Sequence, residues 1–397
     1  MRDFDFWALN EKIIFLNHGS FGACPRAVLE KQFEIKRYIE SNPTRFYLFE
    51  HFERLDHVRE VLGRFLRADP EGIVFTPNAT YAVNAALLSE PLSEGDEILV
   101  TDHAYEACVN AARFIARKKR ASLRIAHIPF PIHSHKQISD AIFEAVTPKT
   151  RLALIDHVSS PTALIFPLRE ISSRLQQQGI SVLVDGAHGP GMLDIDLSSL
   201  DLSYYVGTCH KWICAPKGAA FLYVREDLRQ KVHCPIMGFG LSWPEVRASR
   251  FKNLFDWPGT FDPSPILAVP EAIHCLGRKL PGGWQEIRLH NTNLIRKAVH
   301  ILCEHLQIEP PCPSDLWGAM ATLILPLKKT DMIQTHWLVS PLGEKLSKEY
   351  GIEVAVPPWS GENVLLRISA QLYNDIEDYT ILARALKEII GKRKGLL

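Results

Sequence analysis

The stretch "ISVLVDGAHGPG", residues 180–191, runs from a block of apolar residues into an aspartate and three glycines. A near-continuous apolar run of this length is typical of a strand that is buried on both faces of a parallel sheet. Asp185 would end that strand, and the glycines after it keep the backbone open. In an open α/β sheet, ligands bind beyond the carboxyl ends of the strands. The stretch therefore predicts an α/β fold and the edge of the sheet where the chemistry lies.

Six further apolar runs lie on either side of this one along the chain. They are "GIVFT" (72–76), "DEILVT" (96–101), "SLRIAHIP" (122–129), "RLALIDHV" (151–158), "LSYYVG" (202–207) and "AAFLYV" (219–224). Helix-like segments separate several of these runs, such as residues 103–119 and 168–179. The alternation predicts a mostly parallel sheet flanked by helices.

The length of the chain and a proline-rich connection predict a second domain. With 397 residues the chain is too long for one ordinary core. Residues 256–270, "DWPGTFDPSPILAVP", read as a connection, and shorter strand-like runs follow at 322–327 and 364–370. We therefore expect an N-terminal arm (1–25), a large domain (26–264) and a smaller C-terminal α+β domain (265–397) to which the arm contributes.

The composition excludes several classes of protein. Lysine and arginine together number 45, as do aspartate and glutamate, so no basic excess points to nucleic acid or to an anionic membrane. No apolar run is long enough to span a membrane, and the N-terminus lacks the apolar core of a secretory signal. The eight cysteines are scattered without zinc-site spacing, so we expect no metal site and free thiols in a cytoplasmic protein.

The segment "FTPNATYAVNAALL" (75–88) places a helix directly after a strand. The start of such a helix offers unpaired backbone N–H groups and a favourable dipole for an anion such as phosphate. Asn78, Ala79 and Thr80 stand at that turn, and Thr80 adds a hydroxyl. The alternative is an ordinary helix start with Asn78 as its N-cap. The spacing is not that of a Walker A loop, so a nucleoside triphosphate is not indicated.

Ionisable side chains also follow strand ends. Asp185 can pair with a buried cation, such as a protonated ring nitrogen, or can cap the next turn, and His188 can face the same ligand. In "GTCHKW" (207–212), Lys211 follows another apolar run, with Thr208 and His210 as nearby donors. A buried lysine has a lowered pKa and forms Schiff bases, whereas a solvated lysine at a strand end is the plainer alternative.

His103, in "TDHAYEAC" (101–108), follows a strand and can stack on a planar ring, or it can serve as a helix cap or core residue. An anion-binding turn, an imidazole, a strand-end aspartate and a strand-end lysine thus occur in that order on separate strands. Pyridoxal 5'-phosphate (PLP) requires this set: a helix N-terminus for its phosphate, a carboxylate for its ring nitrogen and a lysine for its aldehyde.

The chain resembles the fold-type I PLP-dependent enzymes of aminotransferase class V, and within them the isopenicillin N epimerase-like branch. The motifs that carry the resemblance extend over almost the whole chain: "FLNHGSFG", "NPTRFY", "TPNAT", "TDHAYEAC", "DHVSSPTALIFPL", "DGAHGPG", "GTCHKW", "WPGTFDPSP" and "LLRISAQLYN". The resemblance implies a fold-type I PLP-dependent transferase fold, PLP as the cofactor, and a homodimer with its active sites at the subunit interface.

The resemblance also implies a role for each matching residue. Lys211 would form the Schiff base with PLP, Asp185 would pair with the pyridinium nitrogen, and His103 would stack on the ring. The remaining cofactor contacts would come from His188 and Ser160 near the ring hydroxyl, from Asn78, Ala79, Thr80, Thr208 and His210 at the phosphate, and from Gly259 and Thr260, which match a Gly-Thr pair that the partner subunit contributes.

For the substrate, Arg367 in "LLRISA" resembles the arginine that clamps an α-carboxylate as a bidentate pair, although a strand-edge salt bridge is an alternative. Asn17 resembles part of an N-terminal loop that folds over the substrate. Arg45 matches a position that could reach a second acidic group, and a plain surface arginine is the alternative.

The implied reaction takes place at the α-carbon of an amino acid bound as an external aldimine, and an epimerase or racemase is the leading prediction. A carbon–sulfur lyase acting on cysteine conjugates or cysteine sulfoxides, or an aminotransferase, are the alternatives. Epimerisation requires a second acid/base, for which Tyr105, His18 and His51 are candidates. A persulfide-forming desulfurase is disfavoured, because residues 353–369 contain no cysteine.

Two other classes of protein fit less well. A nicotinamide dehydrogenase would use a similar sheet, but no G-x-G-x-x-G follows the first strands. A non-catalytic scaffold would not need the complete set of lysine, aspartate and arginine.

Overall fold

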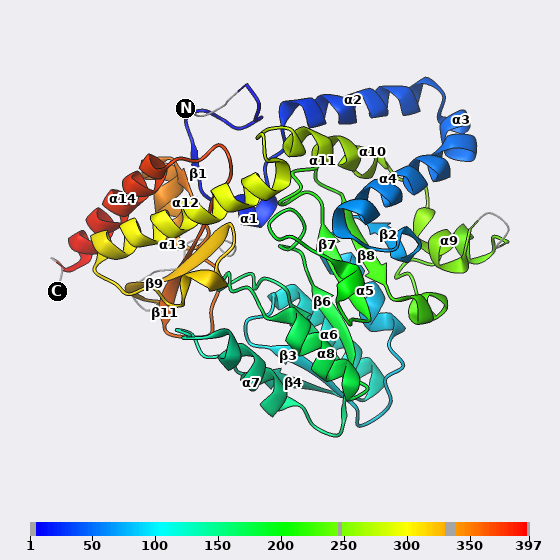
Figure 1. Ribbon diagram of the computed structural model, residues 1–397, viewed down its shortest axis with the longest axis horizontal. Coiled ribbons are helices and arrows are strands. Elements are labelled where there is room, and N and C mark those ends of the chain that lie inside the picture. The colour runs from blue at the N-terminus through cyan, green and yellow to red at the C-terminus, as the bar shows by residue number, and fades with distance from the viewer. Residues whose placement is uncertain (1–4, 245–247, 330–338, 395–397) are drawn as a thin grey trace.

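The structure is a computed structural model that describes residues 5–244, 248–329 and 339–394. Its centre is a seven-stranded sheet with the strand order β2-β8-β7-β6-β5-β3-β4 (Figure 1). The strands are β2 (Ile73–Thr76), β3 (Glu97–Thr101), β4 (Ser122–Ala126), β5 (Thr150–Asp156), β6 (Ser181–Asp185), β7 (Tyr204–Thr208) and β8 (Ala220–Val224). β8 runs antiparallel to both of its neighbours, and the other paired strands are parallel. The prediction of a mostly parallel α/β sheet is therefore confirmed.

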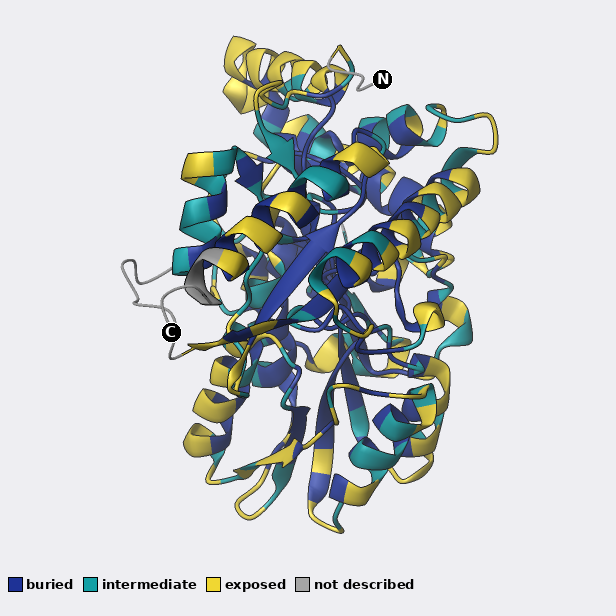
Figure 2. Ribbon diagram, turned by 90° about the vertical axis from the view of Figure 1, so that its left-hand side faces the viewer, coloured by how far each residue is buried: buried dark blue, intermediate teal, exposed yellow. Residues whose placement is uncertain are grey.

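Both faces of this sheet are covered by helices, which is why its central strands are largely apolar, whereas the edge strand β4 is mostly exposed. In β5, Leu152 and Leu154 belong to the cluster that contains α5 (Ala79–Ser89) and α6 (Glu106–Lys119). Ala153 and Ile155, which point the other way, belong to the cluster that also contains helices α4, α7, α8 and α11. These helices are α4 (His51–Leu66), α7 (His135–Ala145), α8 (Leu168–Gln177) and α11 (Val269–Gly277). Figure 2 shows the buried strands between helices whose outer faces are exposed.

The C-terminal part of the chain has its own antiparallel pair, β9 (Met320–Lys328) with β11 (Asn363–Ser369). Three helices lie beside it in Figure 1: α12 (Gly283–Leu306), α13 (Pro341–Tyr350) and α14 (Ile376–Lys394). The N-terminal segment joins this part, because β1 (Ile14–Phe15) pairs in parallel with β10 (Ile352–Glu353). The division into domains at residues 264 and 265 stays a prediction.

The remaining elements are short, apart from α2 (Arg26–Ser41). They are the helices α1 (His18–Phe21), α3 (Pro43–Arg45), α9 (Arg250–Asp256) and α10 (Ser264–Leu267), the π-helical turn η1 (Phe46–Glu50), and the 3-10 turns η2 (Pro70–Gly72), η3 (Leu197–Ser199), η4 (Glu226–Lys231), η5 (Phe239–Leu241) and η6 (Ser314–Leu316). Among the described helices, none combines the length and the apolar character that crossing a membrane requires. All eight cysteines are described, and all are free thiols.

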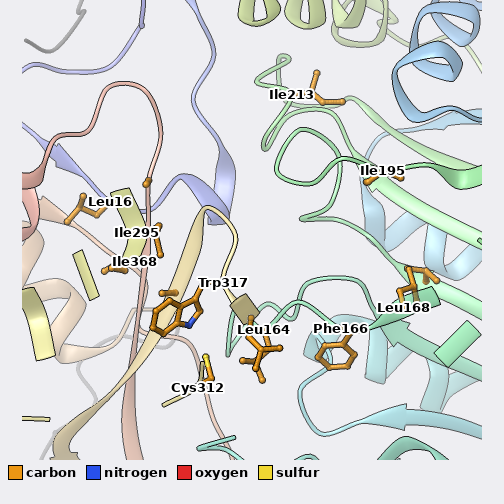
Figure 3. Packing of buried hydrophobic residues seen from close by; sticks show 14 of the residues in the cluster. Leu16, Leu164, Phe166, Leu168, Ile195, Ile213, Ile295, Cys312, Trp317 and Ile368 are labelled. Carbon is orange, nitrogen blue, oxygen red and sulfur yellow. The ribbon is translucent and has the colours of Figure 1, made fainter. Parts of the chain in front are cut away.

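One apolar cluster connects the seven-stranded sheet to the β9–β11 pair. It joins Leu16, which follows β1, and Ile368 of β11 to Leu164 and Phe166, which follow β5, and Trp317 lies between these two groups (Figure 3). This continuous packing brings β11 next to the carboxyl ends of β5, β6 and β7. The candidate site lies at that junction.

Candidate active site

A cavity of about 280 Å³ lies beyond the carboxyl ends of β5, β6 and β7. Its wall also includes the N-terminus of α5, the turn before α6, residues of α1, and Arg367 of β11. Ten of the predicted site residues line it: Asn78, Ala79, Thr80, Ser160, Asp185, His188, Thr208, His210, Lys211 and Arg367. Residues from seven separate segments therefore converge on one space, as the rule for open α/β sheets predicts.

Lys211 follows β7 in a tight turn and lines the cavity, where its side chain is half-buried. Burial, reinforced by the charge of Arg367 and opposed by that of Asp185, lowers the pKa of Lys211 to about 8. The backbone of the turn is held from outside by α1, since Nε2 of His18 lies 3.0 Å from the Lys211 carbonyl oxygen. Gly22, with φ of +69°, packs so closely that a Cβ there would lie 2.0 Å from the His210 carbonyl oxygen. The amine is thus a half-buried nucleophile on a fixed backbone.

His188 lies beside this amine, with its Nε2 atom 3.3 Å from Nζ of Lys211. Its other ring nitrogen, Nδ1, accepts a hydrogen bond from the indole N–H of Trp212 at 3.4 Å. Burial and the neighbouring charges of Lys211 and Arg367 hold the pKa of His188 well below its ordinary value. The ring is therefore neutral with its proton on Nε2, from which it can donate to an uncharged amine.

Asp185 ends β6 and forms part of the cavity wall. Its Oδ1 accepts the backbone N–H of Ala187 at 3.0 Å, and its Oδ2 accepts the thiol of Cys108 at 3.2 Å. Gly186 follows because Tyr205 leaves no room for a side chain: a Cβ would lie 2.1 Å from its ring. A carboxylate at this place suits a counter-ion for a cationic ring nitrogen.

The start of α5 forms another wall of the cavity. Asn78 is the N-cap, as one of the two sequence interpretations predicted, and its side chain accepts the N–H of Tyr81 at 2.9 Å. The backbone N–H groups of Ala79 and Thr80 belong to the first turn and need no intrahelical acceptor. Thr208 and His210 line the same cavity. This arrangement can receive a phosphate without excluding the N-cap interpretation.

Arg367 is 4% exposed and forms no ion pair with any carboxylate among the described residues. Its Nη1 donates to the backbone oxygen and to Oγ of Ser160, at 2.7 and 3.1 Å, and its Nη2 donates to Oγ of Ser20 at 2.8 Å. Its Nε has no partner within the described part of the chain. Burial lowers the pKa of Arg367 to about 10, opposed by the nearby Tyr105. A buried guanidinium without a counter-charge is costly, so the arrangement favours binding of an anionic group here.

His103 is not among the residues that line this cavity, and its predicted stacking on the cofactor ring stays a prediction. Its Nδ1 lies 2.8 Å from the hydroxyl of Thr162, its Nε2 lies 3.1 Å from the carbonyl oxygen of Ile128, and its ring meets Trp359 edge-on. The cause is local, since α6 begins at Glu106 and the residues before it form a turn. That turn buries His103 and places Tyr105, which is 49% exposed, on the cavity wall.

Of the three acid/base candidates, only Tyr105 lines the cavity. His18 is buried behind the Lys211 turn, where its Nδ1 lies 2.8 Å from the hydroxyl of Tyr373. His51 packs against the C-terminal end of α9, with Nε2 3.0 Å from the Asp256 carbonyl oxygen.

Four other predicted residues also lie outside the wall of the cavity. Asn17 acts indirectly, because its Oδ1 accepts the hydroxyl of Ser20, which in turn contacts Arg367. Arg45 pairs with Glu50 at 3.1 Å. Gly259 and Thr260 lie in an exposed turn after α9, and their predicted contact with a partner subunit stays a prediction.

Cys108 and Asp156 line the cavity and were not identified from the sequence. The sequence contained a hint of each. Asp156 is the acidic residue near the end of the apolar run at 151–158, and Cys108 lies near the start of the helix-like segment that follows a strand. Phe21 and Ser20, from α1, line the mouth as well. The pairing of β1 with β10 and the hydrogen bond from the Gly19 N–H to Oγ of Ser369 bring them to the site, and no local pattern predicts these contacts.

The cavity fits PLP by the chemistry of its walls. A half-buried amine, a carboxylate with two donors and the free N–H groups of a helix start lie on separate segments, which matches the aldehyde, ring nitrogen and phosphate of the cofactor.

Comparison with known proteins supports the same assignment. Residues 22–379 match the family model for aminotransferase class V. The isopenicillin N epimerase of Streptomyces clavuligerus is 31% identical, over 97% of this chain and 96% of that protein. The probable chloroplastic L-cysteine desulfhydrase of Arabidopsis thaliana is 28% identical, over 94% of this chain and 82% of that protein.

Two solved structures of the cystine C–S lyase C-DES, one of them with glycine covalently linked to the PLP cofactor, share the fold. Each has a TM-score of 0.78. The alignments cover 95% of this chain in both cases, and 98% and 97% of the two solved chains. Their sequence identities are 22% and 21%, so they bear on the fold alone.

Proposed function

Because the chain belongs to the aminotransferase class V family and is a PLP-dependent enzyme of fold type I, we propose that it inverts the α-carbon of an amino acid, as an epimerase or racemase does. PLP, when bound, supplies the electron sink that makes the α-proton of an attached amino acid acidic. Lys211 would hold its aldehyde, Asp185 its ring nitrogen, and the first turn of α5 its phosphate.

Arg367 binds and orients the substrate. Its buried guanidinium already points its Nη atoms toward Ser160 and Ser20, and its Nε is available for a further acceptor. A substrate carboxylate supplies the missing counter-charge and fixes the amino acid in one orientation. A substrate held in this way would present its α-hydrogen to the amine of Lys211.

Lys211 moves the proton on one side of the substrate. With its pKa lowered to about 8, an appreciable fraction of the amine is uncharged at neutral pH and can act as a base. His188, neutral and fixed by Trp212, donates from Nε2 and orients the amine.

The observation that carries the proposal is the presence of Tyr105 on the same cavity wall as Arg367. Tyr105 follows β3 and Lys211 follows β7, and β5 and β6 lie between them in the sheet. The proposal requires that the phenol and the amine reach a substrate bound at Arg367 from opposite faces. Inversion needs this arrangement, in which one group removes the proton and the other returns it to the opposite face.

The test uses the full-length, PLP-loaded protein with a panel of amino acids in D2O, followed by NMR of the α-proton and by chiral chromatography. The panel includes cysteine conjugates and their sulfoxides. Loss of the α-proton signal together with appearance of the D-isomer supports the proposal. Exchange with complete retention of configuration contradicts it.

A carbon–sulfur lyase is the second candidate, and the similarity to a cysteine desulfhydrase over most of the chain favours it. In this reaction Tyr105 would protonate a departing sulfur instead of the α-carbon. Pyruvate and ammonia formed from a sulfur-bearing substrate would establish it. Formation of the matching 2-oxo acid would instead indicate an aminotransferase.

We further propose that the active protein is a homodimer in which Gly259 and Thr260 complete the partner's phosphate site. Apolar side chains are exposed near this turn on η1 and around η5: Leu48, Phe49, Met237, Phe239 and Leu241. An aromatic contact joins η1 to the segment just before this turn, since Tyr47 meets Trp257 at 5.7 Å between ring centroids. A second copy of the chain would cover this apolar surface.

A further inference from the structure

Two carboxylates end neighbouring strands at the floor of the cavity. Asp156 is the last residue of β5 and Asp185 is the last residue of β6, and the two are direct partners in the parallel register. Parallel strands lie about 4.8 Å apart, and both side chains line the same cavity. Both residues are buried.

The two carboxyl groups have different surroundings. Asp185 accepts an N–H from Ala187 and a thiol from Cys108. Oδ2 of Asp156 is buried and has no hydrogen-bond partner among the described residues. The hydroxyl of Thr101, at the end of β3, is also buried and lies beside Asp156.

This difference decides which group carries a proton. Two carboxylates that share a buried site cannot both ionise at ordinary cost, so the group with fewer donors stays protonated. Burial, followed by the charge of Asp185, holds the pKa of Asp156 well above its ordinary value, and the Thr101 hydroxyl opposes this only in part.

Cys108 on α6 is another titratable group beside Asp156. Burial and the two aspartates raise the pKa of its thiol well above the ordinary value, and Lys211 opposes this rise. Cys108 therefore remains a neutral donor to Asp185. The floor then holds three acidic groups and one negative charge.

We propose that Asp156 is a positioning residue that remains a neutral carboxylic acid beside Asp185 and thereby leaves Asp185 as the single negative charge facing the cofactor nitrogen. An ionised Asp156 would repel the charge of Asp185 and would draw its proton. The role of Asp185 toward PLP comes from the proposed function, whereas the protonation state of Asp156 is measured without reference to any reaction.

The first experiment is infrared spectroscopy of the full-length, PLP-loaded protein in D2O at neutral pH. We expect a band from a protonated carboxyl group that shifts on labelling with [4-¹³C]aspartate. The label separates Asp156 from Glu90, the buried glutamate whose pKa is also raised, chiefly by burial. A spectrum without a label-sensitive carboxylic acid band overturns the proposal, and this arm needs no variant.

The second experiment compares Asp156→Asn, Asp185→Asn and the control Asp140→Asn, which alters a surface aspartate paired with Lys136 on α7. An amide resembles a neutral acid, so Asp156→Asn should remove the band and change the PLP dissociation constant by no more than about twofold. Asp185→Asn should weaken PLP by about tenfold or more, because a charge-assisted hydrogen bond is lost. Equal losses for both variants would mean that Asp156 is ionised, which contradicts the proposal.

The pH dependence of the free energy of unfolding tests the protonation state of Asp156 independently. A folded state that keeps a proton on Asp156 loses stability as pH rises above 3.8, the ordinary aspartate value, toward the raised folded pKa. Asp156→Asn has no such slope, so its advantage over the wild type should grow with pH through this window. An advantage that shrinks as pH rises overturns the proposal. If the band and this slope are present but no α-proton exchange occurs, only the proposed function fails.

Discussion

Nζ of Lys211 lies 3.3 Å from Nε2 of His188 in the cavity wall, and no carboxylate of the described residues forms an ion pair with either group. Because the imidazole is neutral and the amine has a lowered pKa, the pair is held together without an ionic interaction. This state is suited to attack on an aldehyde, since only the uncharged amine is a nucleophile.

The rate of Schiff-base formation should therefore rise with pH through a midpoint near 8, the lowered pKa of Lys211, instead of near its ordinary value of 10.5. Stopped-flow absorbance after adding PLP to cofactor-free protein measures this. Lys211→Ala should show no Schiff-base band, and Lys136→Ala, on the surface of α7, should behave as the wild type. A midpoint close to 10.5 would show that the amine is not desolvated.

Arg367→Leu should separate binding from stability. Loss of the guanidinium removes about 2–5 kcal/mol of carboxylate binding, which raises KM roughly 30-fold or more. The free energy of unfolding should not fall, because a buried charge without a carboxylate partner is replaced by an apolar group. Steady-state kinetics and thermal unfolding test the two halves, with the exposed Arg384→Leu as control. A marked loss of stability with unchanged KM would refute the substrate role.

Tyr105→Phe keeps the ring and removes the hydroxyl. If the phenol returns the proton, formation of the D-isomer should fall by about 10²–10⁴-fold. Exchange of the α-proton with D2O should persist, because Lys211 still removes and returns it on its own side. Chiral analysis and NMR of the same samples distinguish these rates. If both rates are unchanged, the second acid/base is a different group.

Arg59 and Asp256 form a buried ion pair that joins α4 to the end of α9, and both are 1% exposed. Arg59→Leu should cost about 3–5 kcal/mol, because it leaves the carboxylate of Asp256 buried without its guanidinium. Chemical denaturation measures the change. The double variant Arg59→Leu/Asp256→Leu should recover part of the loss, whereas an additive loss would mean that the pair is not coupled.

The Gly259–Thr260 turn that follows α9 allows a complementation test of the dimer. Thr260→Glu would place a negative charge against the partner's phosphate site, and Lys211→Ala removes the amine, so each homodimer should be inactive. After the two are mixed and re-equilibrated, half of the dimers are mixed and each has one intact site, which restores about a quarter of the activity. No recovery would place Thr260 in its own subunit's site or outside both.

The sequence predicted the sheet well because each buried strand is a short apolar run with a polar end. All seven predicted runs are strands, and the two runs at 322–327 and 364–370 form β9 and β11. The carboxyl ends of these strands also located Asp185 and Lys211. These features are local, so neighbouring residues in the sequence suffice to recognise them.

The positions that were missed or misplaced depend on contacts that are distant in the sequence or on a shift of a few residues. The turn before α6 decides whether His103 or Tyr105 faces the cavity, and its exact start cannot be read from residue preferences. Asp156 gains its importance from the register of β5 with β6. The part that Ser20 plays in the site depends on pairing between residues more than 300 positions apart.

The contact between Ser20 and Arg367 also bears on how substrates should be screened. The N-terminal turn supports the guanidinium on one side and packs on the Lys211 backbone on the other. A preparation that has been clipped just after Phe21 would keep the large sheet and the cofactor's main anchors, and it would still be yellow. It would nevertheless bind carboxylates badly and give a false negative for every candidate amino acid. Intact-mass analysis should therefore precede any substrate panel, because colour alone does not certify a competent enzyme.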